Sequence, residues 1–280
     1  MSIAAELREI AGDYATHRDL LAQFILRDVR IRYKQAAMGL LWALFLPLML
    51  VGAGLLVRLA IASAAGVSVN ADALGSLAVS GVIWAGFSAA VSFGTGSLVS
   101  NSTLVGKVQF PREVLPVAAV LASAVDTLVG LALLAALLPW LGGVASPALV
   151  WVPLLLLLLL AMTLALVLLL SAANLFFRDV KYLVQALLTV GVLFTPVFYS
   201  PAEVGARAAG WLAWNPLTPI LEGVRLALFR GHGLGGRFVE NGITVWSPWM
   251  LVTATATAVV GLVIASIAFH RAEELFAERI

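Results

Sequence analysis

Long apolar runs separated by short polar segments make up most of the chain. A membrane-spanning helix needs roughly 20 predominantly apolar residues, because the hydrocarbon core of a bilayer is about 30 Å thick. We therefore expect an all-α membrane protein, a single domain over residues 1–280 whose bundle of six transmembrane helices covers 36–270. The expected spans are 36–62, 74–98, 114–138, 148–171, 182–199 and 246–269.

The N-terminal segment carries charge, unlike the run that follows it. Six basic and five acidic residues lie within residues 1–35, and the next charged residue is Arg58. On a helix, Arg27, Arg30 and Lys34 form one basic stripe beside an apolar stripe. The pattern predicts an amphipathic interface helix, with its cations toward lipid phosphates and its apolar side toward acyl chains. The simpler alternative is a cytoplasmic lead-in to an ordinary span.

Residues 201–230 break the pattern of full-length spans. Two apolar stretches, 202–214 and 217–229, flank Asn215 and Pro216. At 1.5 Å per residue, each stretch gives about 20 Å of helix, which is too short to cross the bilayer. We therefore predict a re-entrant helical hairpin between the fifth and sixth spans. An amphipathic external loop is the alternative.

Lys and Arg counts predict the orientation, because cytoplasmic loops are enriched in these residues. The loops at 63–73 and 139–147 contain none, whereas the elbow at 101–116 and the segment at 174–181 contain two each. The N-terminal segment has six, and the tail at 271–280 has two. Both termini are therefore expected in the cytoplasm. Four arginines between the fifth and sixth spans oppose this, but the rule is weak for long segments.

Composition supports membrane insertion and removes several function classes. The chain is 62% hydrophobic and 11% charged, whereas soluble domains carry about 25% charged residues. It contains no cysteine, which excludes a disulfide framework and a thiol nucleophile. Basic residues sit at the ends of spans and are not interleaved with aromatic residues, so no nucleic-acid partner is expected. The glycine-rich segment 231–245 predicts a flexible external loop.

The sequence predicts neither a nucleotide site nor a metal site. The Gly106–Lys107 pair lacks a glycine five residues earlier, so the phosphate-binding Walker A pattern fails. The three histidines, His17, His232 and His270, fall in separate regions and predict no metal site. We therefore expect no catalytic residue in this chain and no cofactor bound by it.

Asp126 lies well inside an apolar run, where a carboxylate is expensive and often functional. It has three possible roles: carrying protons, pairing with a basic residue of a neighbouring helix, or accepting a hydrogen bond from a Ser or Thr. We favour a structural partner, because no second intramembrane acid forms a relay.

Four stretches carry a family resemblance. They are RYKQAAMGLLW at 32–42, NLFFRDVKYLVQ at 174–185, FTPVFYS at 194–200 and NPLTPILEGVR at 215–225. In this order, with an interface helix and six expected spans, they resemble the permease subunit of polysaccharide ABC exporters. These type-2 ABC permeases export O-antigen, capsule, teichoic acid or galactan, and the resemblance covers almost the whole chain.

The resemblance implies binding partners for the chain and specific roles for two of its segments. It implies a homodimer within membrane lipids, two copies of a cytoplasmic ATPase that binds ATP and magnesium, and a lipid-linked glycan as cargo. It also implies that the elbow docks the ATPase and that the re-entrant hairpin shapes an outer gate. The candidate ATPase contacts are Lys107, Phe110, Arg112 and Glu113. For Glu113 alone, an acid favoured at a helix start by the helix dipole is an equal alternative.

Aromatic side chains are candidates for the path of a glycan, because they pack against the apolar C–H faces of sugars and offer few fixed charges. The candidates are Met38, Trp42, Phe45, Trp84, Phe87, Phe198 and Tyr199. Trp42 and Phe45 are preferred, because they begin about 9 Å inside the first apolar run. The alternatives are interfacial belts and helix-packing seams.

Three other functions compete with glycan export. A type-2 permease for drugs or small lipophiles fits the interface helix equally well. A membrane glycosyltransferase needs clustered acids, whereas Asp72, Glu203, Glu222 and Glu240 are scattered along the chain. An ion-coupled carrier would use Asp126 and show paired inverted repeats, and no convincing repeat relates the two halves.

Overall fold

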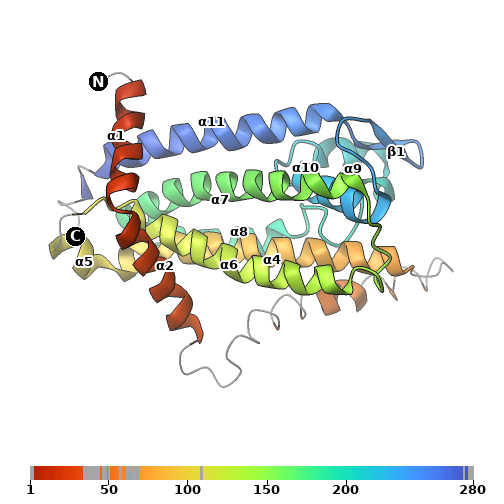
Figure 1. The fold of residues 1–280 in the computed structure, drawn as a ribbon, viewed down its shortest axis with the longest axis horizontal. Helices are drawn as coiled ribbons and strands as arrows, with labels where there is room; N and C mark the ends of the chain where they lie inside the picture. Colours follow the sequence, from red (N-terminus) through yellow and green to blue (C-terminus); the bar gives the residue numbers. More distant parts are fainter. Residues whose placement is uncertain are drawn as a thin grey trace.

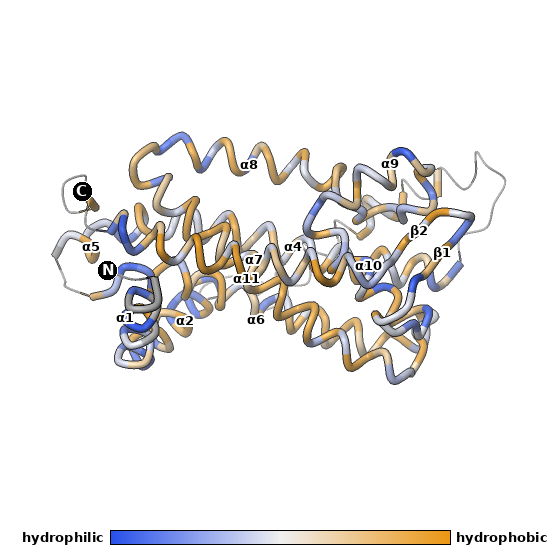
Figure 2. Tube along the Cα trace, turned by 90° about the horizontal axis from the view of Figure 1, so that it is seen from above, coloured by the Kyte–Doolittle hydropathy of each residue, from blue (hydrophilic) through white to orange (hydrophobic). Residues whose placement is uncertain are grey.

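The computed structural model shows a bundle of long helices (Figure 1). Four of them, α4 (Ala71–Ser100), α6 (Val114–Leu137), α7 (Trp151–Phe176) and α11 (Pro248–Glu273), run side by side along the long axis. Hydropathy follows this axis, since apolar residues fill the middle of the bundle and polar residues gather at its two ends (Figure 2). The structure describes residues 3–33, 45, 49, 51–56, 59–60, 63, 70–107, 110–273 and 275–276.

Within these ranges, four helices are long and apolar enough to cross a membrane. They correspond to the second, third, fourth and sixth predicted spans, and they make the chain a multi-pass membrane protein. The fourth predicted span, which contains most of α7, begins with a 3-10 turn at Pro147–Val150. The Ser146 hydroxyl accepts a hydrogen bond there from the Ala148 N–H (3.3 Å). The first predicted span, 36–62, lies largely outside the described residues.

The fifth predicted span, 182–199, is helical only in its first half. Helix α8 (Val180–Gly191) has 12 residues, which is about 18 Å of helix, and turns follow it. Pro196 lacks the N–H that a helix needs, and it disfavours helical backbone at the residue before it. A short 3-10 turn, Pro201–Glu203, comes next. The prediction of one continuous helix here is therefore wrong.

One end of the bundle, named here the elbow end, carries α1 (Ile3–Thr16), α2 (Arg18–Tyr33) and α5 (Ser102–Lys107) (Figure 1). The interface helix predicted within 1–35 is two helices that meet at His17. Helix α1 contacts α11, and α2 packs across α6. Figure 1 shows α1 and α2 lying across the bundle axis, an orientation that suits helices on a membrane surface.

The opposite end, named here the hairpin end, carries α9 (Gly205–Leu212) and α10 (Thr218–Arg225) (Figure 1). A single π-helical turn, Leu226–Arg230, continues α10. The predicted break at Asn215 and Pro216 is confirmed, because turns separate the two short helices there. Both helices have eight residues and are too short to span a bilayer.

The segment predicted as a flexible loop, 231–245, contains a β-hairpin. Strand β1 (Phe238–Glu240) pairs antiparallel with β2 (Ile243–Trp246). Asn241 and Gly242, which connect them, have φ angles of 53° and 76°. A two-residue turn with two positive φ angles is favoured by Asn-Gly, so this pair was the sequence signal for the hairpin. The fold is therefore mostly helical, which fits the all-α prediction, and this two-stranded hairpin is the only sheet among the described residues.

Small residues allow the long helices to pack closely. Gly86 of α4 faces Thr127 of α6, and Gly94 of α4 faces Val167 of α7. A side chain added at either glycine would overlap its neighbour on the facing helix. Close approach at small residues is the usual way in which helices associate within lipid.

Candidate functional site

A buried arginine organises the hairpin end. Arg225 of α10 is 7% exposed, and its guanidinium donates hydrogen bonds to the Ser80 hydroxyl of α4 (2.7 Å) and to Glu222 Oε1 (2.6 Å). It also donates to the backbone carbonyls of Val197 (2.8 Å) and Tyr199 (2.9 Å). The planar guanidinium offers five donors, and these contacts join α10, α4 and the turns after α8.

A second contact joins the same segments. The Asn215 side-chain amide donates hydrogen bonds to the Phe194 carbonyl (3.1 Å) and to the Thr195 hydroxyl (2.9 Å). Arg225 and Asn215 stand at the two ends of the stretch 215–225, and both bind the stretch 194–200. Two of the four stretches that carried the family resemblance therefore form one hydrogen-bonded unit.

The structure gathers acids that are far apart in the sequence. A polar cavity of about 140 Å³ opens beside Arg225. Its charged lining residues are Asp72, Glu203, Glu222, Arg225, Arg230 and Glu240. Arg230 bridges Asp72 (3.1 Å) and Glu240 (3.1 Å), so the cavity holds paired charges. The four acids that lie far apart in the sequence therefore line one cavity. Their separation in the sequence is thus no argument against a glycosyltransferase.

An ion pair lies in the middle of the described bundle. Nη1 of Arg32 in α2 lies 2.7 Å from Oδ2 of Asp126 in α6. Nη2 of Arg32 donates a hydrogen bond to the Ser123 hydroxyl (3.0 Å), and the guanidinium lies 4.3 Å from the centre of the Phe93 ring. Asp126 therefore has the structural partner that we favoured, a basic residue of a neighbouring helix.

The elbow, residues 101–116, is held by segments from both ends of the chain. Phe110 packs against Phe24 of α2, with the ring centres 6.0 Å apart. Arg112 donates to the backbone carbonyl of Glu273 (2.8 Å), and its own N–H donates to the Glu273 carboxylate (3.0 Å). The elbow is therefore joined to α2 and to the last turn of α11.

Glu113, directly before α6, is 3% exposed. The Tyr14 hydroxyl of α1 donates a hydrogen bond to its Oε2 (3.0 Å), and His270 Nδ1 of α11 lies 3.6 Å from its Oε1. Burial raises the pKa of the Glu113 carboxyl, the Tyr14 hydrogen bond opposes this, and the charge of Glu273 adds to it. Burial also raises the pKa of the Tyr14 hydroxyl, which keeps it a donor. Glu113 stands at the N-cap position of α6, and its side chain makes no capping hydrogen bond to that helix.

The predicted path residues occupy different environments. Trp84 is 7% exposed and packs in the core against Phe87, with ring centres 5.6 Å apart. Phe198 is half-buried against Gly54, and the Tyr199 hydroxyl donates to the Leu193 carbonyl (2.8 Å). Phe45 is 39% exposed. Trp84, Phe87 and Phe198 belong to one hydrophobic cluster.

Four of the predicted site residues lie outside the part of the chain whose side chains the structure describes. The side chains outside the described part are Lys34, Met38, Trp42 and Lys107. Of the basic stripe on the interface helix, Arg30 is exposed on α2, whereas Arg27 pairs with Asp28 (2.9 Å) and lies over the Phe24 ring.

Helix α8 presents apolar side chains that the sequence analysis did not single out. On α8 these exposed residues are Tyr182, Leu183, Leu187 and Val190, and exposed Leu193 and Phe194 follow in the turns after it. Figure 2 shows α8 along one side of the bundle. The sequence of α8 is amphipathic, with Lys181, Gln185 and Thr189 at four-residue spacing on one stripe and apolar residues around the rest of the helix.

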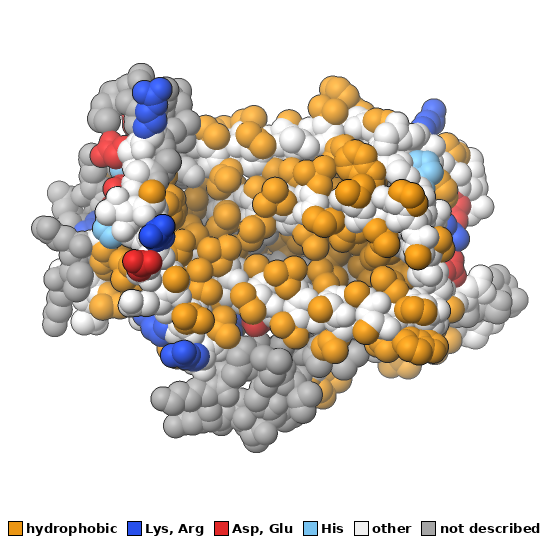
Figure 3. Space-filling view, viewed as in Figure 1, with side chains coloured by type: hydrophobic (Ala, Val, Ile, Leu, Met, Phe, Trp, Pro, Cys, Tyr) orange, Lys and Arg blue, Asp and Glu red, His pale blue; other side chains and the backbone are white. Residues whose placement is uncertain are grey.

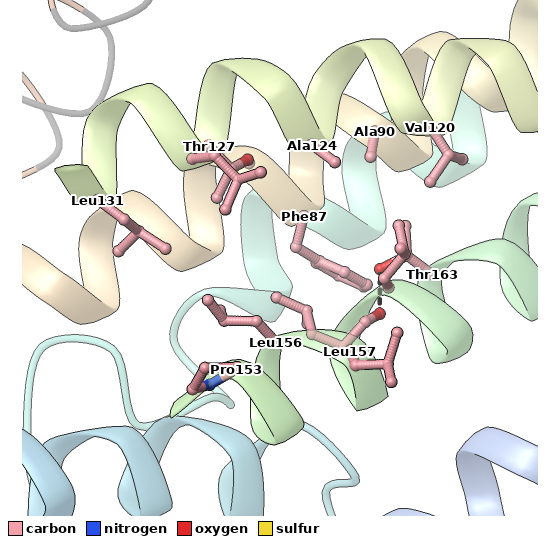
Figure 4. Close-up of a pocket in the computed structure, with 14 residues that line it drawn as sticks. Phe87, Ala90, Val120, Ala124, Thr127, Leu131, Pro153, Leu156, Leu157 and Thr163 are labelled. Carbon is pink, nitrogen blue, oxygen red and sulfur yellow. Dashed lines mark hydrogen bonds between the residues drawn. The ribbon is translucent and has the colours of Figure 1, made fainter. Parts of the chain in front are cut away.

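An apolar cavity of about 370 Å³ lies between α4, α6 and α7. Figure 4 shows Phe87 from α4, Ala124 and Thr127 from α6, and Leu156 and Leu157 from α7 around it. The space-filling view shows hydrophobic side chains over the long helices, charged side chains at the two ends, and a hollow in the apolar face (Figure 3). Such a cavity accommodates an apolar group.

Three known proteins are similar along most of the chain. An O-antigen export system permease protein RfbA of Myxococcus xanthus is 29% identical over 267 residues, covering 94% of this chain and 96% of the relative. Two RfbA permeases of Klebsiella pneumoniae are 23% identical over 262 residues (93% and 94% covered) and 24% identical over 205 residues (72% and 77% covered).

The sequence model of the family described as ABC-2 type transporter matches residues 20–229. This range includes α2, which carries Arg32, and the elbow. It also includes the buried Arg225 and the segment that Arg225 binds. On these grounds, the chain belongs to the ABC-2 type transporter family.

Proposed function

We propose that the chain is the transmembrane permease subunit of an ATP-driven exporter. The exported molecule is a lipid-linked polysaccharide of the O-antigen type. The observation that carries this proposal is the nearly end-to-end similarity to O-antigen export system permease proteins. The chain contributes the path through the cytoplasmic membrane and no ATPase site of its own. A partner supplies the ATP-binding site and its magnesium.

The elbow end is the proposed docking surface for the ATPase, and it faces the cytoplasm with both termini. A docking surface has to transmit force, so it must be held rigidly. The elbow meets this requirement, because Phe110 packs against α2 and Arg112 holds Glu273 of α11. Motion of the ATPase would pass from the elbow into α6 and α11 together.

A homodimer, with two copies of the ATPase, is the proposed assembly. The exposed apolar side chains of α8 and of the turns after it support this assembly, because exposed Tyr182 and Phe194 suit a subunit contact or an aromatic path between subunits. Phe45 and Trp42, both predicted to line the path of the glycan, would add to it. The hairpin end, with its cavity of paired charges, would stand at the exit of the glycan.

One observation favours a second function, export of a small lipophile. The apolar cavity between α4, α6 and α7 is lined almost entirely by aliphatic side chains and Phe87, with Thr127 and Thr163 as its polar members. A membrane lipid tail fills such a space equally well. Binding of the exported lipophile in this cavity would support the second function, whereas binding of a membrane lipid tail would not.

Co-purification tests the proposal. The chain should be expressed together with candidate ATP-binding subunits of ABC exporters from the same organism and isolated in detergent through a tag on the chain alone. We expect a stable complex with equal numbers of the two subunits. A chain that purifies without any ATP-binding protein, under conditions that keep it folded, would contradict the proposal.

A further inference from the structure

Three ionisable side chains meet at the elbow end, from positions far apart in the sequence. Glu113 stands before α6, and His270 and Glu273 lie in the last turns of α11. One ligand-type atom of each, a carboxylate oxygen or an imidazole nitrogen, lies within 4.8 Å of the other two. Imidazole and carboxylate groups together form a donor set that suits zinc.

The distance between Glu113 and His270 fits a shared cation better than a hydrogen bond. Oε1 of Glu113 and Nδ1 of His270 are 3.6 Å apart, which is too long for a hydrogen bond. Two ligands of one tetrahedral zinc ion, with bonds of about 2.0–2.1 Å, lie about 3.4 Å apart. The two atoms therefore stand close to the separation that one bound ion requires.

The buried oxygen has no other donor among the described residues. Glu113 is almost fully buried, and its hydrogen bond from Tyr14 goes to Oε2, which leaves Oε1 facing His270. Glu273 is arranged in the same way, since the Arg112 N–H donates to its Oε1. Carboxylates that bind metals are commonly oriented by such hydrogen bonds to one oxygen.

Charge also favours a cation. The carboxylates of Glu113 and Glu273 stand close enough to interact, and Asp13 of α1 adds a third negative charge nearby. Among the described residues, the Arg112 guanidinium contacts Glu273 only at its backbone carbonyl, and the bond to the Glu273 carboxylate comes from the Arg112 backbone N–H. Buried charge without a partner is strongly destabilising, so a divalent ion would remove a net excess of negative charge.

We propose that Glu113, His270 and Glu273 form a zinc-binding site that fastens the last turn of α11 to the elbow. The side chains supply three ligands, and water completes the coordination. The inference stands on the geometry of this cluster and holds whether or not the chain exports a glycan. Under the proposed function, the ion would stiffen the surface on which the ATPase docks.

The test uses the full chain in detergent micelles, purified with a tag free of histidine and stripped with a chelator. Zinc chloride is titrated while bound zinc is measured by elemental analysis after gel filtration and the thermal unfolding midpoint is recorded. We expect about one zinc ion per chain and a midpoint that rises with zinc. Magnesium at the same concentration should give neither, because it prefers oxygen ligands and water.

Variants assign the ligands. His270→Ala and Glu273→Gln should each weaken zinc binding at least tenfold, and Tyr14→Phe should weaken it by a smaller factor. His17→Ala is the matched control, because His17 lies on the same side of the molecule and should leave binding unchanged. Equal zinc binding by wild type and Glu273→Gln would overturn the proposal, and so would a loss in His17→Ala as large as in His270→Ala.

Discussion

Nη1 of Arg225 lies 2.6 Å from Oε1 of Glu222, and both side chains are almost fully buried at the hairpin end. The same guanidinium binds Ser80 of α4 and two carbonyls of the turns after α8. One side chain therefore fixes the position of α10 against α4 and against the segment that completes the fifth predicted span.

Replacing Arg225 should damage the hairpin end severely. Arg225→Met leaves Glu222 buried without its partner, and breaking a buried pair in this way destabilises by about 3–5 kcal/mol. The unfolding midpoint of the purified chain measures the effect. Arg230→Met is the matched control, because its ion pairs are exposed and each contributes about 0–1 kcal/mol. Equal losses in the two variants would show that the buried network does not hold α10.

The Arg32–Asp126 pair should act as a structural clamp. Arg32→Gln and Asp126→Asn should each destabilise the chain, and a double variant should show a coupling energy of about 0.5–3 kcal/mol. Thermal unfolding of the wild type, the two single variants and the double variant gives this value.

The same variants distinguish an ion-coupled carrier from an ATP-driven exporter. Folded Asp126→Asn should retain ATP-driven export, because its carboxylate carries no transported proton in the present account. Transport that responds to an imposed proton gradient, and that Asp126→Asn abolishes, would favour the carrier.

The elbow should bind the ATPase directly. Changing Phe110 and Arg112 together to alanine should weaken complex formation at least tenfold while membrane insertion is kept. Binding of the purified subunits in detergent measures this loss. The matched control changes Phe177 and Arg178, an aromatic–basic pair in the other short charged segment, which should reduce binding less. An unchanged complex in the Phe110 and Arg112 variant would count against docking at the elbow.

Trp42 and Phe45 are predicted to line the path of the glycan. Changing both to alanine should reduce export several-fold, because a sliding sugar loses the aromatic faces against which it packs. Export is measured as glycan at the cell surface, and assembly of the complex is checked by gel filtration. Trp140 and Trp249, exposed aromatics at the hairpin end, supply the control pair. Normal export in the Trp42 and Phe45 variant would indicate that these two side chains face lipid or a neighbouring helix.

Much of the fold could be predicted from hydropathy alone. Spans such as Val114–Leu137 are marked by length and apolar composition, which the bilayer dictates. The break at Asn215 and Pro216 was also readable, because proline lacks an N–H and limits the residue before it. The end of α8 at Gly191 was missed, although Pro196 carried the same kind of signal.

The sites were less predictable, because their residues meet only through tertiary packing. Glu113 lies directly before α6 and His270 in the last turns of α11, so no local spacing reveals that they stand together. Asp72 and Glu240 likewise line one cavity, where Arg230 bridges them, although they are far apart in the sequence. In contrast, Asp126 was marked in advance, since a lone carboxylate in an apolar run requires a partner.

The most direct test of the central claim is ATP hydrolysis by the permease–ATPase complex in lipid vesicles. The chain alone should hydrolyse no ATP, and the complex should hydrolyse it faster when a lipid-linked glycan is added than when a small lipophile is added. Turnover by the isolated chain, or stimulation by the lipophile and not by the glycan, would contradict the account.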